Sequence, residues 1–126
     1  MARILIAEDD ATTRLQMVRL ARKMGHEVLQ SSNGRRAWEL LEDNPDVQLL
    51  VTDVVMPEMD GTALISKLRG DARFGDLPIL IVSHHVGVKD VARFLDNGAT
   101  AFLRKPLEQK ELADYIARYV EGIDLA

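Results

Sequence analysis

The sequence predicts an α/β protein built on one open, five-stranded parallel sheet with helices on both faces. Short apolar runs alternate with segments of helical periodicity five times, and the connections between them are short. Two of the runs, at about 47–52 and at 79–82, are apolar and rich in β-branched residues, as is typical of strands buried on both faces. Strict alternation requires right-handed crossovers, and five units are too few for an eight-stranded barrel. The sheet is therefore expected to be open.

The first two strand–helix units precede this central strand. An apolar run at 4–7 ends abruptly in acidic residues, and apolar residues recur at helical spacing over 11–24 until Gly25 stops the helix. A weaker strand candidate at 27–31, expected near an edge of the sheet, is followed by a turn that starts a second helix. That helix ends near Asn44.

The third unit is the centre of the predicted sheet. Its strand ends in Asp53, and Pro57 stops the chain from continuing as a strand. Asp60-Gly61 opens a third helix that fades at Gly70, and a polar connection at 71–77 leads to the next strand.

The last two units complete the alternation. The strand at 79–82 is followed by Ser83, and a helix over 88–96 is closed by an Asn-Gly pair. A short strand at 100–103 and a final helix over 107–120 follow. The whole chain, 1–126, is expected to form a single domain because its length suits one hydrophobic core.

The composition excludes several classes of function. Hydrophobic residues make up 47% of the chain and charged residues 29%, which is typical of an ordered globular protein. A net charge of −4 argues against direct nucleic-acid binding and against an anionic membrane surface. The absence of cysteine excludes thiolate chemistry, disulfides and cysteine-based zinc sites. No apolar run is long enough for a membrane span or a signal peptide, so a cytoplasmic location is expected.

Acidic residues follow the two strands that should flank the crevice of this sheet. An open parallel sheet binds ligands at the carboxyl ends of its strands, where the winding reverses. The flavodoxin-like strand order 2-1-3-4-5 places that reversal between the first and third strands. Those strands end in Glu8-Asp9-Asp10 and in Asp53. A buried Asp needs a cation or hydrogen-bond partners, although Asp53 as a capping or turn residue is the alternative.

The convergent carboxylates need a counter-charge. Three acids within a few ångströms do not all stay ionised alone, and oxygen ligands suit hard cations such as Mg²⁺. The alternative to a metal site has Asp10 as a helix N-cap and Glu8 or Asp9 as partners of a lysine. We favour the N-cap for Asp10 and the metal for Asp9 and Asp53. Lys105, directly after the fifth strand, fits a structural ion pair and a phosphate anchor equally well. The Ser83 hydroxyl can donate either to an anion at the crevice or within its own turn.

These groups together are the parts needed to make an acyl phosphate. A carboxylate serves as nucleophile, a divalent cation neutralises phosphoryl oxygens, and an ammonium and a hydroxyl donate to the remaining charge. Neither histidine nor cysteine is required for this chemistry.

The arrangement resembles the receiver domain of two-component response regulators, and the likeness covers essentially the whole chain. The motifs that carry it are Glu8-Asp9, Asp53 followed by Met56-Pro57 and Asp60-Gly61, Ser83, and Lys105-Pro106. The resemblance implies a phosphoacceptor in a phosphorelay, not an enzyme beyond its own phosphorylation and dephosphorylation. The implied phosphodonor is a sensor histidine kinase or a histidine phosphotransfer protein. The implied recipient is a downstream protein or a fused output domain, with a homodimer on phosphorylation as a further option.

The resemblance also assigns roles to individual residues. Asp53 would accept the phosphoryl group and, with Asp9, bind Mg²⁺ directly. Glu8 would act on the Mg²⁺ through water, and the backbone carbonyl of Val55 would be a further ligand. Lys105 would contact the phosphoryl group.

Two further residues would transmit the signal. Ser83 would be the switch hydroxyl that moves toward the phosphate, and Phe102 the aromatic ring whose rotamer follows it. A new dianionic group that attracts a donor would bias the surface formed by the fourth helix, fifth strand and fifth helix.

Three positions depart from the usual pattern of the family. Ser83 stands where Thr is commoner, and Phe102 replaces a frequent Tyr. His84 stands where a small residue usually lines access to the aspartate, and we hypothesise that His84 and the apolar Val55 lengthen the phosphorylated state. A metal site or a pH switch at His84-His85 is a weaker alternative.

Other functions with related folds fit less well. A phosphatase with an aspartate nucleophile would need an acid two residues after Asp53, where Val55 stands. A flavodoxin would need a Ser/Thr/Gly-rich first loop to hold a phosphate. A receiver-like module that works without phosphorylation would lack an acid or the lysine, and none is missing. Trp38 is expected to serve in packing or at the surface. Tyr115 and Tyr119 are expected in the core, with a partner-binding face as the alternative.

Overall fold

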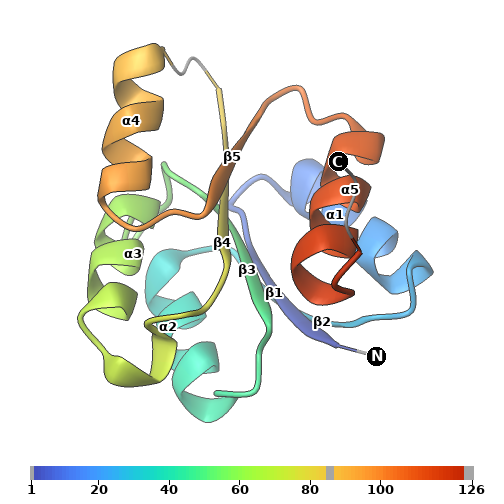
Figure 1. Ribbon diagram of the computed structural model, residues 1–126, viewed down its shortest axis with the longest axis horizontal. Helices are drawn as coiled ribbons and strands as arrows, with labels where there is room; N and C mark the ends of the chain where they lie inside the picture. Colours follow the sequence, from blue (N-terminus) through green and yellow to red (C-terminus); the bar gives the residue numbers. More distant parts are fainter. Residues whose placement is uncertain (1, 85–86, 124–126) are drawn as a thin grey trace.

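The computed structural model describes residues 2–84 and 87–123. Five parallel strands form one sheet in the order β2-β1-β3-β4-β5, which confirms the predicted flavodoxin-like topology and the edge position of the second strand. The strands are β1 (Arg3–Ala7), β2 (Glu27–Ser31), β3 (Leu49–Asp53), β4 (Ile79–Ser83) and β5 (Ala101–Arg104). Figure 1 shows the sheet edge-on between two layers of helices.

Helices follow the strands in strict alternation. They are α1 (Ala11–Lys23), α2 (Gly34–Asp43), α3 (Gly61–Arg69), the short 3₁₀ helix η1 (Ala72–Phe74), α4 (Val88–Asp96) and α5 (Gln109–Val120). Helices α1 and α5 cover one face of the sheet, and α2 and α3 cover the other (Figure 1).

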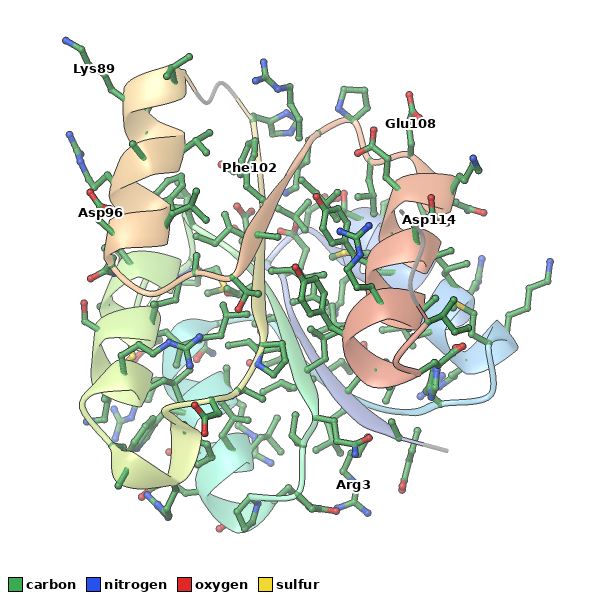
Figure 2. The ribbon with its side chains drawn as sticks, viewed as in Figure 1. Arg3, Lys89, Asp96, Phe102, Glu108 and Asp114 are labelled. Atoms are coloured by element: carbon green, nitrogen blue, oxygen red, sulfur yellow. The ribbon has the colours of Figure 1, made fainter. Side chains whose placement is uncertain are left out.

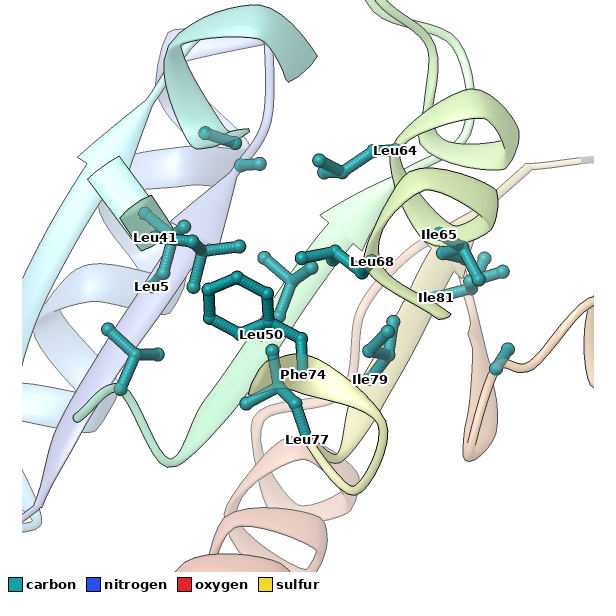
Figure 3. Close-up of a cluster of buried hydrophobic side chains, with 14 of the residues drawn as sticks. Leu5, Leu41, Leu50, Leu64, Ile65, Leu68, Phe74, Leu77, Ile79 and Ile81 are labelled. Atoms are coloured by element: carbon teal, nitrogen blue, oxygen red, sulfur yellow. The ribbon is translucent and has the colours of Figure 1, made fainter. Parts of the chain in front are cut away.

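Successive residues of the strands point to opposite faces, so both faces of the sheet are apolar. Leu50 of β3 packs toward α2 and α3, whereas its neighbours Leu49 and Val51 pack toward α1 and α5. Figure 3 shows the first of these two clusters, in which Phe74 of η1 fills the space beside Leu50. Burial of these side chains is the main force that stabilises the layered fold.

Helix α4 is attached differently from the other α-helices. None of its residues is buried, and Val88 at its first turn is 88% exposed. At its far end, Asn97 accepts a hydrogen bond from the Ser66 hydroxyl at 2.9 Å and donates to the Thr62 carbonyl at 3.2 Å. Side-chain hydrogen bonds to α3 therefore hold α4 mainly at its C-terminal end.

The first strand, the first helix and the fourth strand differ from their predicted boundaries by one residue at one end, and four differences need comment. The central strand covers 49–53 instead of 47–52, because the Val47 amide is still in the turn after α2 and donates to the Asn44 carbonyl. The connection at 71–77 contains η1, which was not predicted. The last strand covers 101–104 instead of 100–103. The last helix begins at Gln109 because Glu108 is an extended N-cap.

Candidate functional site

The carboxyl ends of β1 and β3 bring the predicted acids together. Ala7 and Thr52 are paired in the sheet, so the residues that follow them, Glu8 and Asp53, lie side by side at its carboxyl edge. One carboxylate oxygen from each of Glu8, Asp9 and Asp53 lies within 4.8 Å of the others. This convergence confirms the predicted meeting of two acidic strand ends. We call these three carboxylates and Lys105 the acidic site.

The loop after Asp53 is shaped by a close approach to α3. The amide of Gly61 donates to the Val54 carbonyl at 2.7 Å. A side chain at Gly61 would collide with the carbonyl oxygen of Asp53, so only glycine fits where α3 begins. The Asp53 side chain is fixed in turn, because its Oδ1 accepts a hydrogen bond from the Val54 amide at 2.7 Å. Asp53 is buried, with 8% of its surface exposed.

Lys105 supplies the positive charge of the acidic site. Its amide donates to the Ser83 carbonyl at 2.9 Å, which places it at the carboxyl end of β5 next to β4. Its ammonium forms ion pairs with Glu8 and with Oδ2 of Asp53, the latter at 3.0 Å. The Lys105 side chain is 6% exposed. The structure thus shows the ion pair, and the phosphate-anchor role of Lys105 stays a prediction.

Burial controls the protonation of this site. Burial, together with the smaller effect of the neighbouring Asp53 carboxylate, raises the pKa of Glu8 from about 4.5 to about 7 against the opposing effect of Lys105. Burial works against the charged form of Lys105, but its hydrogen bonds and ion pairs with Glu8 and Asp53 outweigh it and raise the lysine pKa. Lys105 therefore stays charged, while Glu8 exchanges its proton near neutral pH.

Asp10 is the helix N-cap that the sequence predicts. Its carboxylate accepts hydrogen bonds from the amide and the hydroxyl of Thr13, at 2.9 and 2.6 Å. These hydrogen bonds lower the pKa of Asp10. Asp9, in contrast, is exposed beside Asp53.

The donor set of the acidic site fits a hard divalent cation. All of its ligand candidates are carboxylate oxygens, which suit Mg²⁺ better than transition metals. The buried Oε1 of Glu8 forms an ion pair with the Lys105 ammonium. Three carboxylate oxygens within 4.8 Å of one another are therefore able to hold such an ion. The Val55 side chain is 73% exposed and points away from the core.

The two expected switch residues lie at neighbouring strands. Ser83 is buried at the end of β4, and its hydroxyl donates to the carbonyl of His84 at 3.2 Å, within its own turn. Phe102 is half-buried on β5 and packs, with Phe94 of α4, against the cluster shared with α3. Figure 2 labels Phe102 on the side of β5 that faces α4.

The remaining residues singled out from the sequence have structural positions. His84 is exposed just beyond β4, and His85 lies outside the described residues. Trp38 packs edge-on against Phe74, with ring centroids 6.0 Å apart. Tyr115 and Tyr119 stack on each other on α5, also at 6.0 Å, and pack against the cluster under α1 and α5. The packing role expected for these three aromatic residues is confirmed.

One residue next to the acidic site was not predicted. Arg14 of α1 reaches back to the loop after β1, where it donates to the Glu8 carbonyl at 2.8 Å. The sequence has no signal for this contact, because a backbone carbonyl is an acceptor in every residue type.

Comparison with known proteins agrees with this geometry. Residues 4–117 match the family described as the response regulator receiver domain. The chemotaxis protein CheY homolog of Campylobacter jejuni is 34% identical over 113 residues, which are 89% of this chain and 87% of that protein. The signal receiver domain of a histidine kinase from Syntrophus aciditrophicus has a TM-score of 0.87 and 31% identity, covering 100% of this chain and 95% of that one. The chain therefore belongs to the receiver domain family of response regulators.

Some relatives are much longer than this chain. The two-component response regulator-like APRR7 of Arabidopsis thaliana is 35% identical over 111 residues, which are 87% of this chain but 15% of that protein. Within the described residues, no helix is long and apolar enough to cross a membrane.

Proposed function

We propose that this chain is the phosphoacceptor domain of a two-component phosphorelay and that Asp53 receives the phosphoryl group. The observation that carries the proposal is the 3.0 Å contact between Asp53 and the Lys105 ammonium, next to the carboxylates of Glu8 and Asp9. Membership of the receiver family supports the same role. The domain is a phosphoacceptor, not an enzyme that turns over a separate substrate.

The reaction transfers a phosphoryl group from a histidine of a partner kinase or histidine phosphotransfer protein. The P–N bond to the histidine breaks, and a P–O bond to the Asp53 carboxylate forms. Asp9, Asp53 and the Val55 carbonyl would hold Mg²⁺ directly, and Glu8 would hold it through water. When bound, Mg²⁺ supplies positive charge that neutralises the phosphoryl oxygens. Lys105 leaves its ion pair with Asp53 and donates to a phosphoryl oxygen. Its charge thus balances the Asp53 carboxylate before phosphorylation and the phosphoryl group afterwards.

Phosphorylation then changes a surface. The new phosphoryl group attracts the Ser83 hydroxyl away from the His84 carbonyl, and Phe102 moves into the space that the β4–α4 loop leaves. Helix α4 is the element best able to follow, because none of its residues is buried. The surface of α4, β5 and α5 would thereby control a downstream protein, a fused output domain or a homodimer. We expect the domain to meet its kinase in the cytoplasm.

Access to Asp53 sets how long the phosphorylated state lasts. His84 and Val55 are both exposed near the ends of the strands that carry Ser83 and Asp53. We hypothesise that they hinder the water that hydrolyses the acyl phosphate. The His84→Ala variant should lose phosphoaspartate faster than the wild type, and a slower loss would count against this hypothesis.

The test of the function is the mass of the intact chain after incubation with Mg²⁺ and acetyl phosphate. The wild type should gain one phosphoryl group, and Asp53→Asn should gain none. Asp10→Asn is the matched control, because it makes the same acid-to-amide change beside the site and Asn also caps helices. If the small donor fails with every protein, a phosphorylated kinase domain replaces it. A wild type that accepts nothing from either donor contradicts the proposal.

A further inference from the structure

Arg14 connects α1 to the ends of two strands. Its Nη1 donates to the Glu8 carbonyl at 2.8 Å, and its Nε donates to Oε1 of Gln30, on β2, at 3.2 Å. One guanidinium thus joins the loop after β1 to the neighbouring edge strand. The planar fork of arginine suits this double contact, which a lysine ammonium on a flexible chain does not reproduce.

The Glu8 peptide is held from both sides as a result. Its amide donates to the Ser31 carbonyl at 2.9 Å, and its carbonyl accepts from Arg14. The Glu8 carboxylate also accepts from the Asp10 amide at 3.2 Å. Asp9 lies between these fixed points with an exposed side chain, so the direction of its carboxylate depends on the backbone around it.

We propose that Arg14 is a positioning residue for the acidic site: it fixes the loop after β1 so that Glu8 and Asp9 face a common Mg²⁺ ion. This inference rests on the proposed metal site. Partners of this kind, which orient ligands without touching the metal, typically contribute about 10-fold or more to metal affinity.

If Arg14 acted only through its charge, Arg14→Met would bind Mg²⁺ more tightly than the wild type, which is the opposite of what a positioning role predicts. Arg14 adds a positive charge near the acids, and that charge repels a divalent cation. If charge alone mattered, Arg14→Met would bind Mg²⁺ more tightly and Arg14→Lys would bind it like the wild type. If positioning dominates, both variants bind Mg²⁺ more weakly, because neither holds the Glu8 carbonyl and Gln30 together.

Two measurements on the purified chain test the proposal. The first is the Mg²⁺ dissociation constant from calorimetry, which should rise about 10-fold in Arg14→Met and in Arg14→Lys. The second is hydrogen exchange of the Glu8 and Asp10 amides without Mg²⁺, which should become faster in both variants. Arg19→Met, which removes an exposed cation from the same helix, should change neither quantity.

The outcomes separate this inference from the proposed function. Tighter binding by Arg14→Met with unchanged binding by Arg14→Lys overturns the positioning role, as does unchanged binding by both. A wild type that binds no Mg²⁺ overturns the metal site itself. In that case amide exchange still decides whether Arg14 fixes the loop, and unchanged exchange in both variants overturns that part as well.

Discussion

Two clusters in this molecule each pair acids with one basic residue, but one is buried and the other lies at the surface. In the acidic site, the side chains of Glu8 and Lys105 are 0% and 6% exposed. The second, which we call the surface cluster, lies beside η1 and consists of Glu42, Asp71 and Arg73. In the surface cluster, Asp71 and Arg73 are 24% and 47% exposed.

The two clusters shift carboxylate pKa values in opposite directions. Hydrogen bonds from the side chain and amide of Arg73 lower the pKa of Asp71 to about 2. Burial raises the pKa of Glu8 to about 7 although Lys105 contacts it. The comparison shows that a cation partner does not guarantee a stable ionised acid once water is excluded. The acidic site keeps charges that cost folding free energy, as is common where function requires them.

Removal of the buried cation is the largest expected effect. Lys105→Met leaves Glu8 and Asp53 without their ion pair, and we expect a loss of about 3 kcal/mol in unfolding free energy at about pH 8 without Mg²⁺. The loss should shrink at about pH 5, where Glu8 is protonated. Urea unfolding measures both values. The control is Lys110→Met, which replaces an exposed lysine of α5 and should change stability by less than about 0.5 kcal/mol. An equal loss of stability in both variants would contradict the special role of the buried lysine.

Replacement of the buried Glu8 by a neutral residue should raise the unfolding free energy, whereas Lys105→Met lowers it. The change should be of intermediate size. In the wild type without Mg²⁺, the folded state holds the Glu8 proton up to a pKa of about 7, whereas the unfolded state releases it near 4.5. Stability is therefore lost as pH rises through this range. Glu8→Gln does not titrate, so its stability relative to the wild type should rise by about 1–3 kcal/mol between about pH 4 and pH 8.

The control for this titration is an exposed acid. Glu108→Gln changes a glutamate at the start of α5 whose side chain forms no cap hydrogen bond. Its stability relative to the wild type should stay nearly constant over the same pH range. A Glu8→Gln variant that loses stability relative to the wild type as pH rises would show that the ion pair with Lys105 outweighs burial.

The smallest effect belongs to the surface cluster. Asp71→Asn removes the acid that Arg73 contacts at 2.8 Å, and we expect a slight decrease in the thermal midpoint near pH 7. Because the pKa of Asp71 is lowered in the folded state, its contribution exists above about pH 4 and disappears as pH falls toward 2. Added salt should also reduce it, since the pair is exposed. Thermal unfolding with and without salt checks both dependences.

The sequence predicted the topology and the meeting of the acids for a simple physical reason. Strand order and strand ends determine where Glu8 and Asp53 lie. The strand ends follow from apolar patterning that is strong in this chain, and the order is the flavodoxin-like one expected for an open parallel sheet of five strands. It did not predict η1, because a single buried Phe74 in a polar segment has no periodicity. Nor did it decide between the two roles of Lys105, since charge balance depends on side-chain distances that residue types do not specify.

The contacts of Arg14 show the same limit more clearly. Its two acceptors, the Glu8 carbonyl and Gln30, are brought together by the pairing of β1 with β2. A long-range contact to a backbone carbonyl leaves no motif in the sequence. Helix caps such as Asp10 are predictable by comparison, because donor and acceptor lie three residues apart.

The central claim is that Asp53 is the residue that carries the phosphoryl group. The most direct measurement is reduction of the phosphorylated chain with borohydride, which converts an aspartyl phosphate to homoserine, followed by peptide mass spectrometry. We predict homoserine at position 53 and unmodified Glu8, Asp9 and Asp10. Homoserine at another acid of the site, with Asp53 unchanged, would contradict the claim.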